Sequence, residues 1–210
     1  MDKKVYLYVF NTMADWEIGY LTAELNSRRY FKKDSFNLKV ITMGTTKDPI
    51  VTMGGIRVIP DMTVDEFSLE NTSMLILPGG NTWMDSAHEK IISKIKECLD
   101  KKITVAAICG ATMRLAEEGI LNSVKHTSND LEYLKMVCPN YKGEEYYLND
   151  VAVTDSNLIT ASGIAPLEFT LKVLKVLDVF SENTLNAWYN LYKTSEAKYF
   201  YDLMNSMQEQ

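Results

Sequence analysis

The sequence predicts a three-layer α/β fold, in which helices cover both faces of a doubly wound and mostly parallel sheet. Short apolar runs alternate along the chain with segments of helical spacing, as they do in repeated strand–helix units. The runs at 74–77 and 103–108 are continuously apolar, which indicates strands buried on both faces. No linker rich in Gly, Pro or Ser divides the 210 residues, so we expect one main domain.

The first half of the chain supplies four of the expected strands. Val, Tyr and Phe residues, which favour strands, dominate the run at 5–10, and helical spacing follows over 15–28. The short run at 74–77 ends at Pro78-Gly79-Gly80, a sequence typical of a turn. The expected strands of this half are 5–10, 38–43, 56–59 and 74–77.

The second half continues the alternation. Helical spacing over 87–99 places Ile91, Ile95 and Cys98 on one face, and the apolar strand 103–108 follows. The remaining expected helices are 110–118, 129–137 and 167–177, and the remaining strands are 151–154 and 158–161. In such a sheet, functional side chains gather at the carboxyl ends of the strands.

Residues 181–210 differ in character from the α/β domain expected over 1–180. An apolar and aromatic stripe runs through Leu185, Trp188 and Leu203 at rough helical spacing. We expect one or two helices that pack on the domain. The alternative is that this aromatic surface forms a dimer contact or covers the mouth of a site.

Charge and cysteine content narrow the function classes. With 22 Lys plus Arg and 28 Asp plus Glu, the net charge of −6 disfavours nucleic acid and anionic membranes as partners. Three widely spaced cysteines fit a reducing compartment. The apolar run at 5–10 is too short for a signal peptide, and the uncharged run at 103–113 is shorter than a membrane span. We therefore expect a soluble, cytoplasmic protein.

Cys109 is the leading candidate for a reactive residue. It lies where the strand at 103–108 must reverse into a helix, with Ala107, Gly110 and Ala111 around it. This is the spacing of a nucleophile elbow, with sulfur in place of a serine oxygen and alanines in place of the outer glycines. The N–H groups at the start of the following helix favour thiolate over thiol, so we expect a lowered pKa for Cys109. A buried core cysteine is the alternative.

Two further segments are expected beside the sulfur. If the strands at 74–77 and 103–108 are neighbours, the N–H groups of Gly80 and Gly110 converge to form an oxyanion hole. Glu17 follows the first strand, which is usually central in such folds. A protonated Glu17 would donate a hydrogen bond to the sulfur, whereas the alternative is an acidic residue that stabilises the first turn of a helix.

The sequence offers no metal or cofactor motif. His88 and His126 are far apart, and the scattered carboxylates have no ligand spacing. Met53-Gly54-Gly55 lacks the Lys-Ser/Thr that completes a phosphate loop. We expect neither a metal nor a cofactor.

Taken together, the motifs resemble the DJ/PfpI (ThiJ/PfpI) superfamily, which is related to class I glutamine amidotransferases. The resemblance rests on D-x-E after the first strand, L-I-L-P-G-G, A-A-I-C-G-A, K-x-T-S and L-I-T-A-S-G followed by E-F, and it covers about residues 3–178. It implies a flavodoxin-like fold, Cys109 as nucleophile, Glu17 as its protonated partner, and backbone groups of Gly80 and Gly110 around the sulfur. It also implies a homodimer.

Departures from the family pattern concern histidine. The residue after Cys109 is Gly110, where the peptidase-like branch has a histidine. Asn129 follows Thr127-Ser128, where another branch has a histidine, and the amidotransferase H-x-E is absent from residues 163–168. A Cys–His pair usually activates a cysteine for acyl transfer, so proteolysis and glutamine hydrolysis are both disfavoured. His88 is interpreted as a solvated residue of a surface helix.

Three functions remain open. The first is a cysteine-dependent hydrolase- or lyase-type enzyme that acts on a small carbonyl or amide substrate. The resemblance relates such an enzyme to intracellular proteases and amidotransferase-like proteins. The second is a redox or stress-response protein whose thiol is oxidised. The third is a structural or chaperone-like dimer. Candidates for the wall of a substrate site are Trp16, Asn81, Thr82, Trp83 and Asn129.

Overall fold

A central sheet of seven strands organises the computed structural model, which describes residues 3–208. In spatial order the strands are β5 (Met62–Thr63), β2 (Leu38–Gly44), β1 (Lys3–Tyr8), β6 (Thr72–Leu77), β7 (Thr104–Ile108), β9 (Leu158–Ala161) and β8 (Ala152–Asp155). Only β8 runs antiparallel to its neighbour. The predicted α/β class with a mostly parallel sheet is confirmed.

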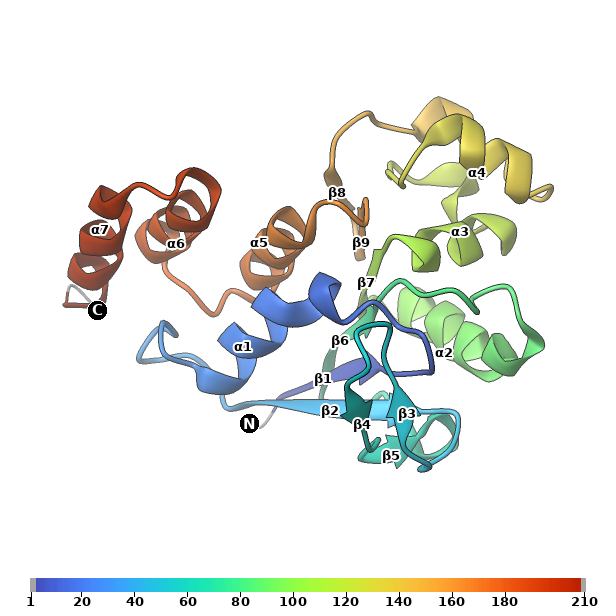
Figure 1. The fold of residues 1–210 in the computed structure, drawn as a ribbon, viewed down its shortest axis with the longest axis horizontal. Coiled ribbons are helices and arrows are strands. Elements are labelled where there is room, and N and C mark those ends of the chain that lie inside the picture. The colour runs from blue at the N-terminus through green and yellow to red at the C-terminus, as the bar shows by residue number, and fades with distance from the viewer. Residues whose placement is uncertain (1–2, 209–210) are drawn as a thin grey trace.

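Helices cover both faces of this sheet (Figure 1). On one face α1 (Gly19–Ser27) contacts β2 and α5 (Pro166–Leu177) contacts β9, while α2 (Glu89–Asp100) and α3 (Gly110–Glu117) contact β7 on the other. α4 (Leu131–Val137) lies beyond α3 at one end of the molecule. Single 3-10 turns are η1 (Asp15–Ile18), η2 (Val64–Glu66), η3 (Ser86–His88), η4 (Ile120–Ser123) and η5 (Glu144–Tyr146).

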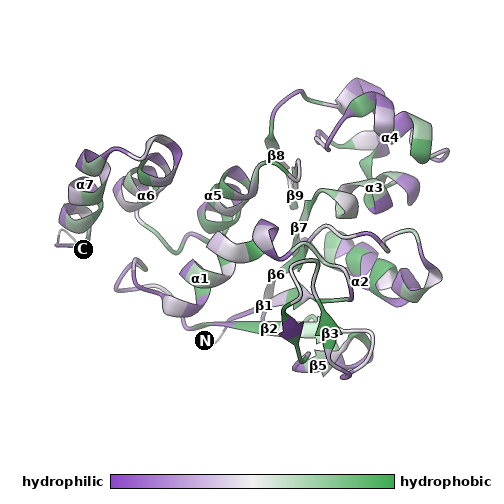
Figure 2. Ribbon diagram, viewed as in Figure 1, coloured by the Kyte–Doolittle hydropathy of each residue, from purple (hydrophilic) through white to green (hydrophobic). Residues whose placement is uncertain are grey.

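The core follows from the continuous apolar strands. Residues 74–77 of β6 and 105–108 of β7 are all buried, because helices cover both faces of these central strands. Figure 2 shows the hydrophobic colours on these strands and mixed colours along the helices that cover them. The predicted element positions therefore agree with the structure to within a few residues at most ends.

Two local expectations need correction. The strand expected at 56–59 is not part of the main sheet: β4 (Arg57–Val58) pairs with β3 (Ile50–Val51) in a separate antiparallel hairpin. Gly55 has a φ of 82° in the turn between them, a conformation that favours glycine. The helix expected over 15–28 is divided into the 3-10 turn η1 and the helix α1.

The C-terminal extension consists of α6 (Glu182–Thr194) and α7 (Ala197–Gln208), which lie beyond α5 in Figure 1. Trp188 and Leu203 are fully buried, and the indole N–H of Trp188 donates to Glu24 Oε1 of α1 at 3.1 Å. α6 is thus tied to the main domain and α7 packs on α6.

Among residues 3–208, no helix combines the length and apolarity that a membrane crossing requires.

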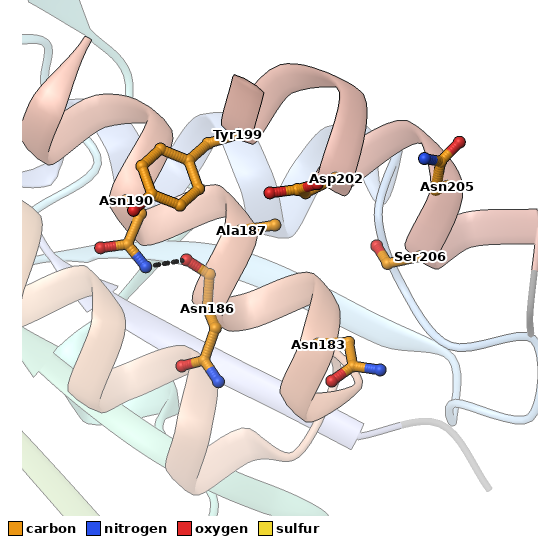
Figure 3. A pocket seen from close by; sticks show the side chains of 8 residues that line it. All are labelled: Asn183, Asn186, Ala187, Asn190, Tyr199, Asp202, Asn205 and Ser206. Carbon is orange, nitrogen blue, oxygen red and sulfur yellow. Dashed lines mark hydrogen bonds between the residues drawn. The ribbon is translucent and has the colours of Figure 1, made fainter. Parts of the chain in front are cut away.

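An open cavity of about 410 Å³ lies between α6 and α7 (Figure 3). It is lined by Asn183, Asn186, Ala187, Asn190, Tyr199, Asp202, Asn205 and Ser206. Figure 3 shows the asparagine side chains spread along the two helices rather than directed at one point. None of the residues predicted for the site lines this cavity, so the site is built elsewhere in the fold.

Candidate active site

Cys109 occupies the sharp turn between β7 and α3. Its backbone has φ 57° and ψ −122°, a strained conformation for a residue with a side chain. The Cys109 N–H donates to Ala161 O of β9 at 2.9 Å, which holds the turn against the sheet. This is the geometry of the nucleophile elbow that the sequence predicted, with the sulfur at the carboxyl end of a central strand.

Close packing explains why Gly110 follows the cysteine. A Cβ at Gly110 would lie 2.8 Å from Gly80 O and 3.2 Å from Trp83 Cδ1. The two glycines are thus adjacent, as expected if β6 and β7 are neighbours. Their part in an oxyanion hole stays a prediction.

Glu17 lies in η1, the first helical turn after the inner strand β1, and its side chain is fully buried. Its Oε2 accepts a hydrogen bond from the N–H of Gly79 at 2.6 Å. Its Oε1 lies beside the cysteine: a Cβ at Gly163 would be 3.1 Å from this oxygen and 2.7 Å from Cys109 Sγ. Oε1 accepts no hydrogen bond within the part of the chain that the structure describes.

Burial controls the protonation of this carboxyl. Loss of hydration raises the pKa of Glu17 to about 7, against the lowering effects of the Gly79 N–H and of the neighbouring Cys109 thiol. Since Oε2 already accepts from Gly79, a proton on the carboxyl belongs on Oε1. From there it can be donated to the sulfur.

The expected lowering of the Cys109 pKa is wrong for this environment. Burial raises the pKa of the thiol, and the charge of an ionised Glu17 raises it further. Hydrogen bonds from Asn129 and Gly110 act in the lowering direction but do not prevail. The effect of Glu17 charge disappears when its carboxyl is protonated, so the two groups titrate as a coupled pair that shares a proton.

Asn129 contacts the sulfur from the loop before α4. Its Nδ2 donates to Cys109 Sγ at 3.3 Å. Its Oδ1 accepts from the N–H of Gly163 at 2.8 Å and from Ser162 Oγ at 3.3 Å. Sequence reasoning named Asn129 as a wall residue but did not foresee this contact, and it missed Gly163. The position of Gly163 after β9, at the same sheet edge as Cys109, was a usable signal.

The other wall candidates have different environments. Trp16 is 51% exposed beside Glu17, and Asn81 is exposed while its N–H donates to Thr12 Oγ1. Trp83 is only 2% exposed, and its indole N–H donates to Pro78 O at 2.8 Å. Trp83 therefore supports the loop from inside the core instead of presenting a surface to a substrate.

Neither histidine contacts the sulfur. His88, expected on the surface, is buried: Tyr8 Oη lies 2.7 Å from its Nδ1 and Thr82 Oγ1 lies 3.1 Å from its Nε2. The expectation failed because three aromatic rings, Tyr8, Phe10 and Trp83, surround the imidazole. Burial lowers the pKa of His88, which favours the neutral ring.

His126 also makes its hydrogen bonds away from the sulfur. Its Nδ1 donates to the carbonyl of Val124 at 2.7 Å, and its Nε2 accepts from the hydroxyl of Tyr141 at 2.8 Å. Within residues 3–208 there is no group of His, Cys, Asp and Glu residues suited to a metal ion. The chemistry that the arrangement offers is thus that of a thiol with a buried carboxyl and several N–H donors.

Comparison with known proteins places this arrangement in a family. The model of the DJ-1/PfpI family matches residues 3–176. The chain belongs to the DJ-1/PfpI family. The uncharacterized protease YoaZ of Bacillus subtilis is 58% identical over 205 residues, which cover 98% of each chain. A crystal structure of a ThiJ/PfpI family protein from Bacillus anthracis is 59% identical, with a TM-score of 0.93 over 98% of this chain and 97% of that one.

A more distant relative carries a specific activity in its name. The glutathione-independent glyoxalase DJR-1.2 of Caenorhabditis elegans is 27% identical over 146 residues. The match covers 67% of this chain and 74% of that protein. The family assignment predicted from the motifs is confirmed.

Proposed function

We propose that this protein is a cysteine-dependent enzyme of the hydrolase or lyase type, which acts on a small carbonyl or amide substrate. Cys109 is the nucleophile and Glu17 its general acid and base. The supporting observation is that Glu17, fully buried, lies beside the sulfur with Oε1 available for a proton and Oε2 held by the N–H of Gly79. A buried carboxyl with a pKa raised to about 7 can hold or release a proton at neutral pH.

In the proposed reaction the Glu17 carboxylate first takes the thiol proton, and the Cys109 thiolate then adds to the substrate carbonyl carbon. A C–S bond forms, the π electron pair of the carbonyl moves onto its oxygen, and the oxygen takes a proton from Glu17 or is stabilised by N–H groups. Gly110 and Gly80 are the proposed backbone donors, because the structure brings them together next to the elbow.

Carbonyl substrates fit this site better than amides. Amide hydrolysis must protonate a leaving nitrogen, which a histidine beside the cysteine usually does. Here His88 and His126 both make their hydrogen bonds away from the sulfur. Carbonyl addition expels no leaving group, and the glyoxalase named among the relatives lends support to this preference.

Turnover assays on the purified protein test the proposal. We expect methylglyoxal to be consumed by the wild type and by Cys138→Ala, whose thiol is a buried core group, but not by Cys109→Ala. Casein and simple amides are expected to be poor substrates. Equal turnover of all tested substrates by Cys109→Ala and the wild type would rule out the nucleophile role.

A redox or stress-response role is the second candidate, and the exposure of the cysteines favours it. Cys109 is partly exposed, whereas Cys98 and Cys138 are buried, so an oxidant reaches Cys109 first. Mild peroxide should add oxygen to Cys109 alone, as measured by peptide mass spectrometry. Oxygen distributed evenly over the three thiols would count against this role.

We also propose that the protein is a cytoplasmic homodimer. Three free cysteines support a reducing compartment. Native mass spectrometry of the full chain measures the assembly, and a monomer at micromolar concentration would contradict the homodimer.

A further inference from the structure

The carboxamide of Asn129 has a fixed orientation at the sulfur. Its Oδ1 accepts from two donors, Gly163 N–H and Ser162 Oγ. Exchange of oxygen and nitrogen would turn the NH₂ group against the Gly163 N–H, so the hydrogen-bond network assigns the N–H to Cys109 Sγ. The amide therefore presents a donor, and no base, to the reacting atom.

Hydrogen bonds on both sides hold the backbone before Asn129. Ser128 Oγ lies 2.7 Å from Thr112 Oγ1, which in turn donates to Cys109 O at 2.6 Å. On the other side the N–H of Thr127 donates to Thr160 Oγ1 of β9 at 2.9 Å. These bonds connect the loop to α3 and to β9, the two elements next to the elbow, and so fix the donor relative to the sulfur.

We propose that Asn129 is a catalytic hydrogen-bond donor that stabilises the Cys109 thiolate and then the oxyanion of the adduct. The second role rests on the proposed function, whereas the first concerns the thiol alone. In the addition step the C–S bond forms and the carbonyl π pair becomes a lone pair on the oxygen. The Asn129 N–H then donates its hydrogen bond to that oxygen instead of to the sulfur. No proton leaves the amide, and Glu17 supplies the proton that neutralises the oxygen.

This role differs from that of an imidazole. A carboxamide does not titrate, so the pH dependence of the thiol is set by Cys109 and Glu17 together. A histidine at position 129 would add a third titrating group near neutral pH. The site of this protein is thus a thiol activated by one neutral amide and one buried acid.

The pH dependence of Cys109 alkylation by iodoacetamide tests the proposal. In Asn129→Ala we expect the midpoint to rise by about one unit, because a hydrogen bond to a charged group is lost. Below the midpoint the variant has about tenfold less thiolate, but each thiolate is a better nucleophile because its thiol is less acidic. The alkylation rate should therefore fall only about threefold. Asn183→Ala, in the exposed first turn of α6, is the matched control and should follow the wild type.

Asn129→Asp separates a catalytic from a structural role. The aspartate keeps an oxygen for Gly163 and Ser162 but offers no N–H to the sulfur and adds a negative charge. We expect its midpoint to exceed that of Asn129→Ala. An Asp variant that matches the wild type, or an Ala variant that matches Asn183→Ala, would overturn the proposal.

Turnover distinguishes the two proposals. If alkylation depends on Asn129 while methylglyoxal and the other carbonyls tested are not consumed, the proposed function is wrong but the thiolate role of Asn129 holds. If turnover occurs, kcat should fall about tenfold in Asn129→Ala with a smaller change in KM, because the donor acts on the oxyanion. An unchanged kcat would contradict the oxyanion role.

Discussion

Glu17 lies with Oε1 beside the sulfur of Cys109, and both groups are held in place by backbone N–H donors. Gly79 donates to the carboxyl, and the N–H of Gly110 opposes the rise in the Cys109 pKa that burial and the Glu17 charge produce. Because a carboxylate and a thiolate repel each other in a buried site, the pair is stable with one negative charge. The behaviour of the site with pH follows from this relationship.

The first prediction concerns stability and pH. Burial raises the pKa of Glu17 from 4.5 to about 7, so between these values the folded state keeps a proton that the unfolded chain has lost. Folding stability therefore falls as pH rises through this window, by about 3 kcal/mol in total. Glu17→Gln cannot ionise and should gain stability over the wild type by this amount between about pH 4.5 and pH 8.

Urea unfolding at several pH values measures the gain. Glu70→Gln, at an exposed carboxyl, is the control and should leave the pH dependence unchanged. Parallel stability curves for Glu17→Gln and the wild type would show that Glu17 is not the buried acid described.

The second prediction concerns the space beside the sulfur. A methyl group at Gly163 would lie 2.7 Å from Cys109 Sγ and 3.1 Å from Glu17 Oε1. We expect Gly163→Ala to slow iodoacetamide alkylation of Cys109 about tenfold, because the site cannot hold the extra methyl without displacement. Gly19→Ala, which meets no atom within 4 Å, should keep the wild-type rate and add about 0.5 kcal/mol of stability. Equal rates in both variants would contradict this geometry.

How far the site could be predicted depends on how local each signal is. Cys109 was predictable because an apolar strand and the small residues of the turn lie next to it in sequence. The position of Glu17 was predictable only through topology, since β1 is an inner strand that lies between β2 and β6. The raised pKa of the thiol was not, because it depends on burial and on a charge from another segment.

His88 shows the same limit in the opposite direction. Helical spacing over 87–99 indicated a surface helix that contains His88, and nothing near His88 in sequence signals burial. Its partners Tyr8 and Thr82 come from β1 and from the loop after β6, which meet only in the folded sheet. Spacing predicts the faces of a helix, but the polar partner of a buried ring is a tertiary property.

The third prediction tests how the C-terminal extension is attached. Trp188 is fully buried and donates to Glu24, which also forms an ion pair with Arg29. Trp188→Phe removes the donor and leaves a cavity, so we expect a loss of about 2–3 kcal/mol in the free energy of unfolding. Phe200→Leu, at an exposed position of α7, should change it by less than about 0.5 kcal/mol. A Trp188→Phe loss as small as that of Phe200→Leu would mean that α6 is attached by other contacts.

The fourth prediction concerns the hydrogen bond between Tyr8 and His88. Both side chains are buried, and the hydroxyl lies 2.7 Å from Nδ1. Tyr8→Phe keeps the ring and leaves one imidazole nitrogen unpaired, which should cost about 1–3 kcal/mol of stability. Urea unfolding measures the cost, and Tyr201→Phe, whose ring is exposed on α7, should cost less than about 0.5 kcal/mol.

The same variant tests whether His88 supports the loop next to the active site. His88 also bonds Thr82, and Trp83 beside it donates to Pro78 O, just before the glycines that adjoin Glu17 and Gly110. If the imidazole turns to find a new partner in Tyr8→Phe, the loop loses its bond to Thr82, and amide exchange at Gly79 and Gly80 should accelerate. Exchange there should stay at the wild-type rate in Tyr201→Phe. A destabilised Tyr8→Phe protein with unchanged exchange at these glycines would show that the His88 cluster stabilises the core without positioning the loop.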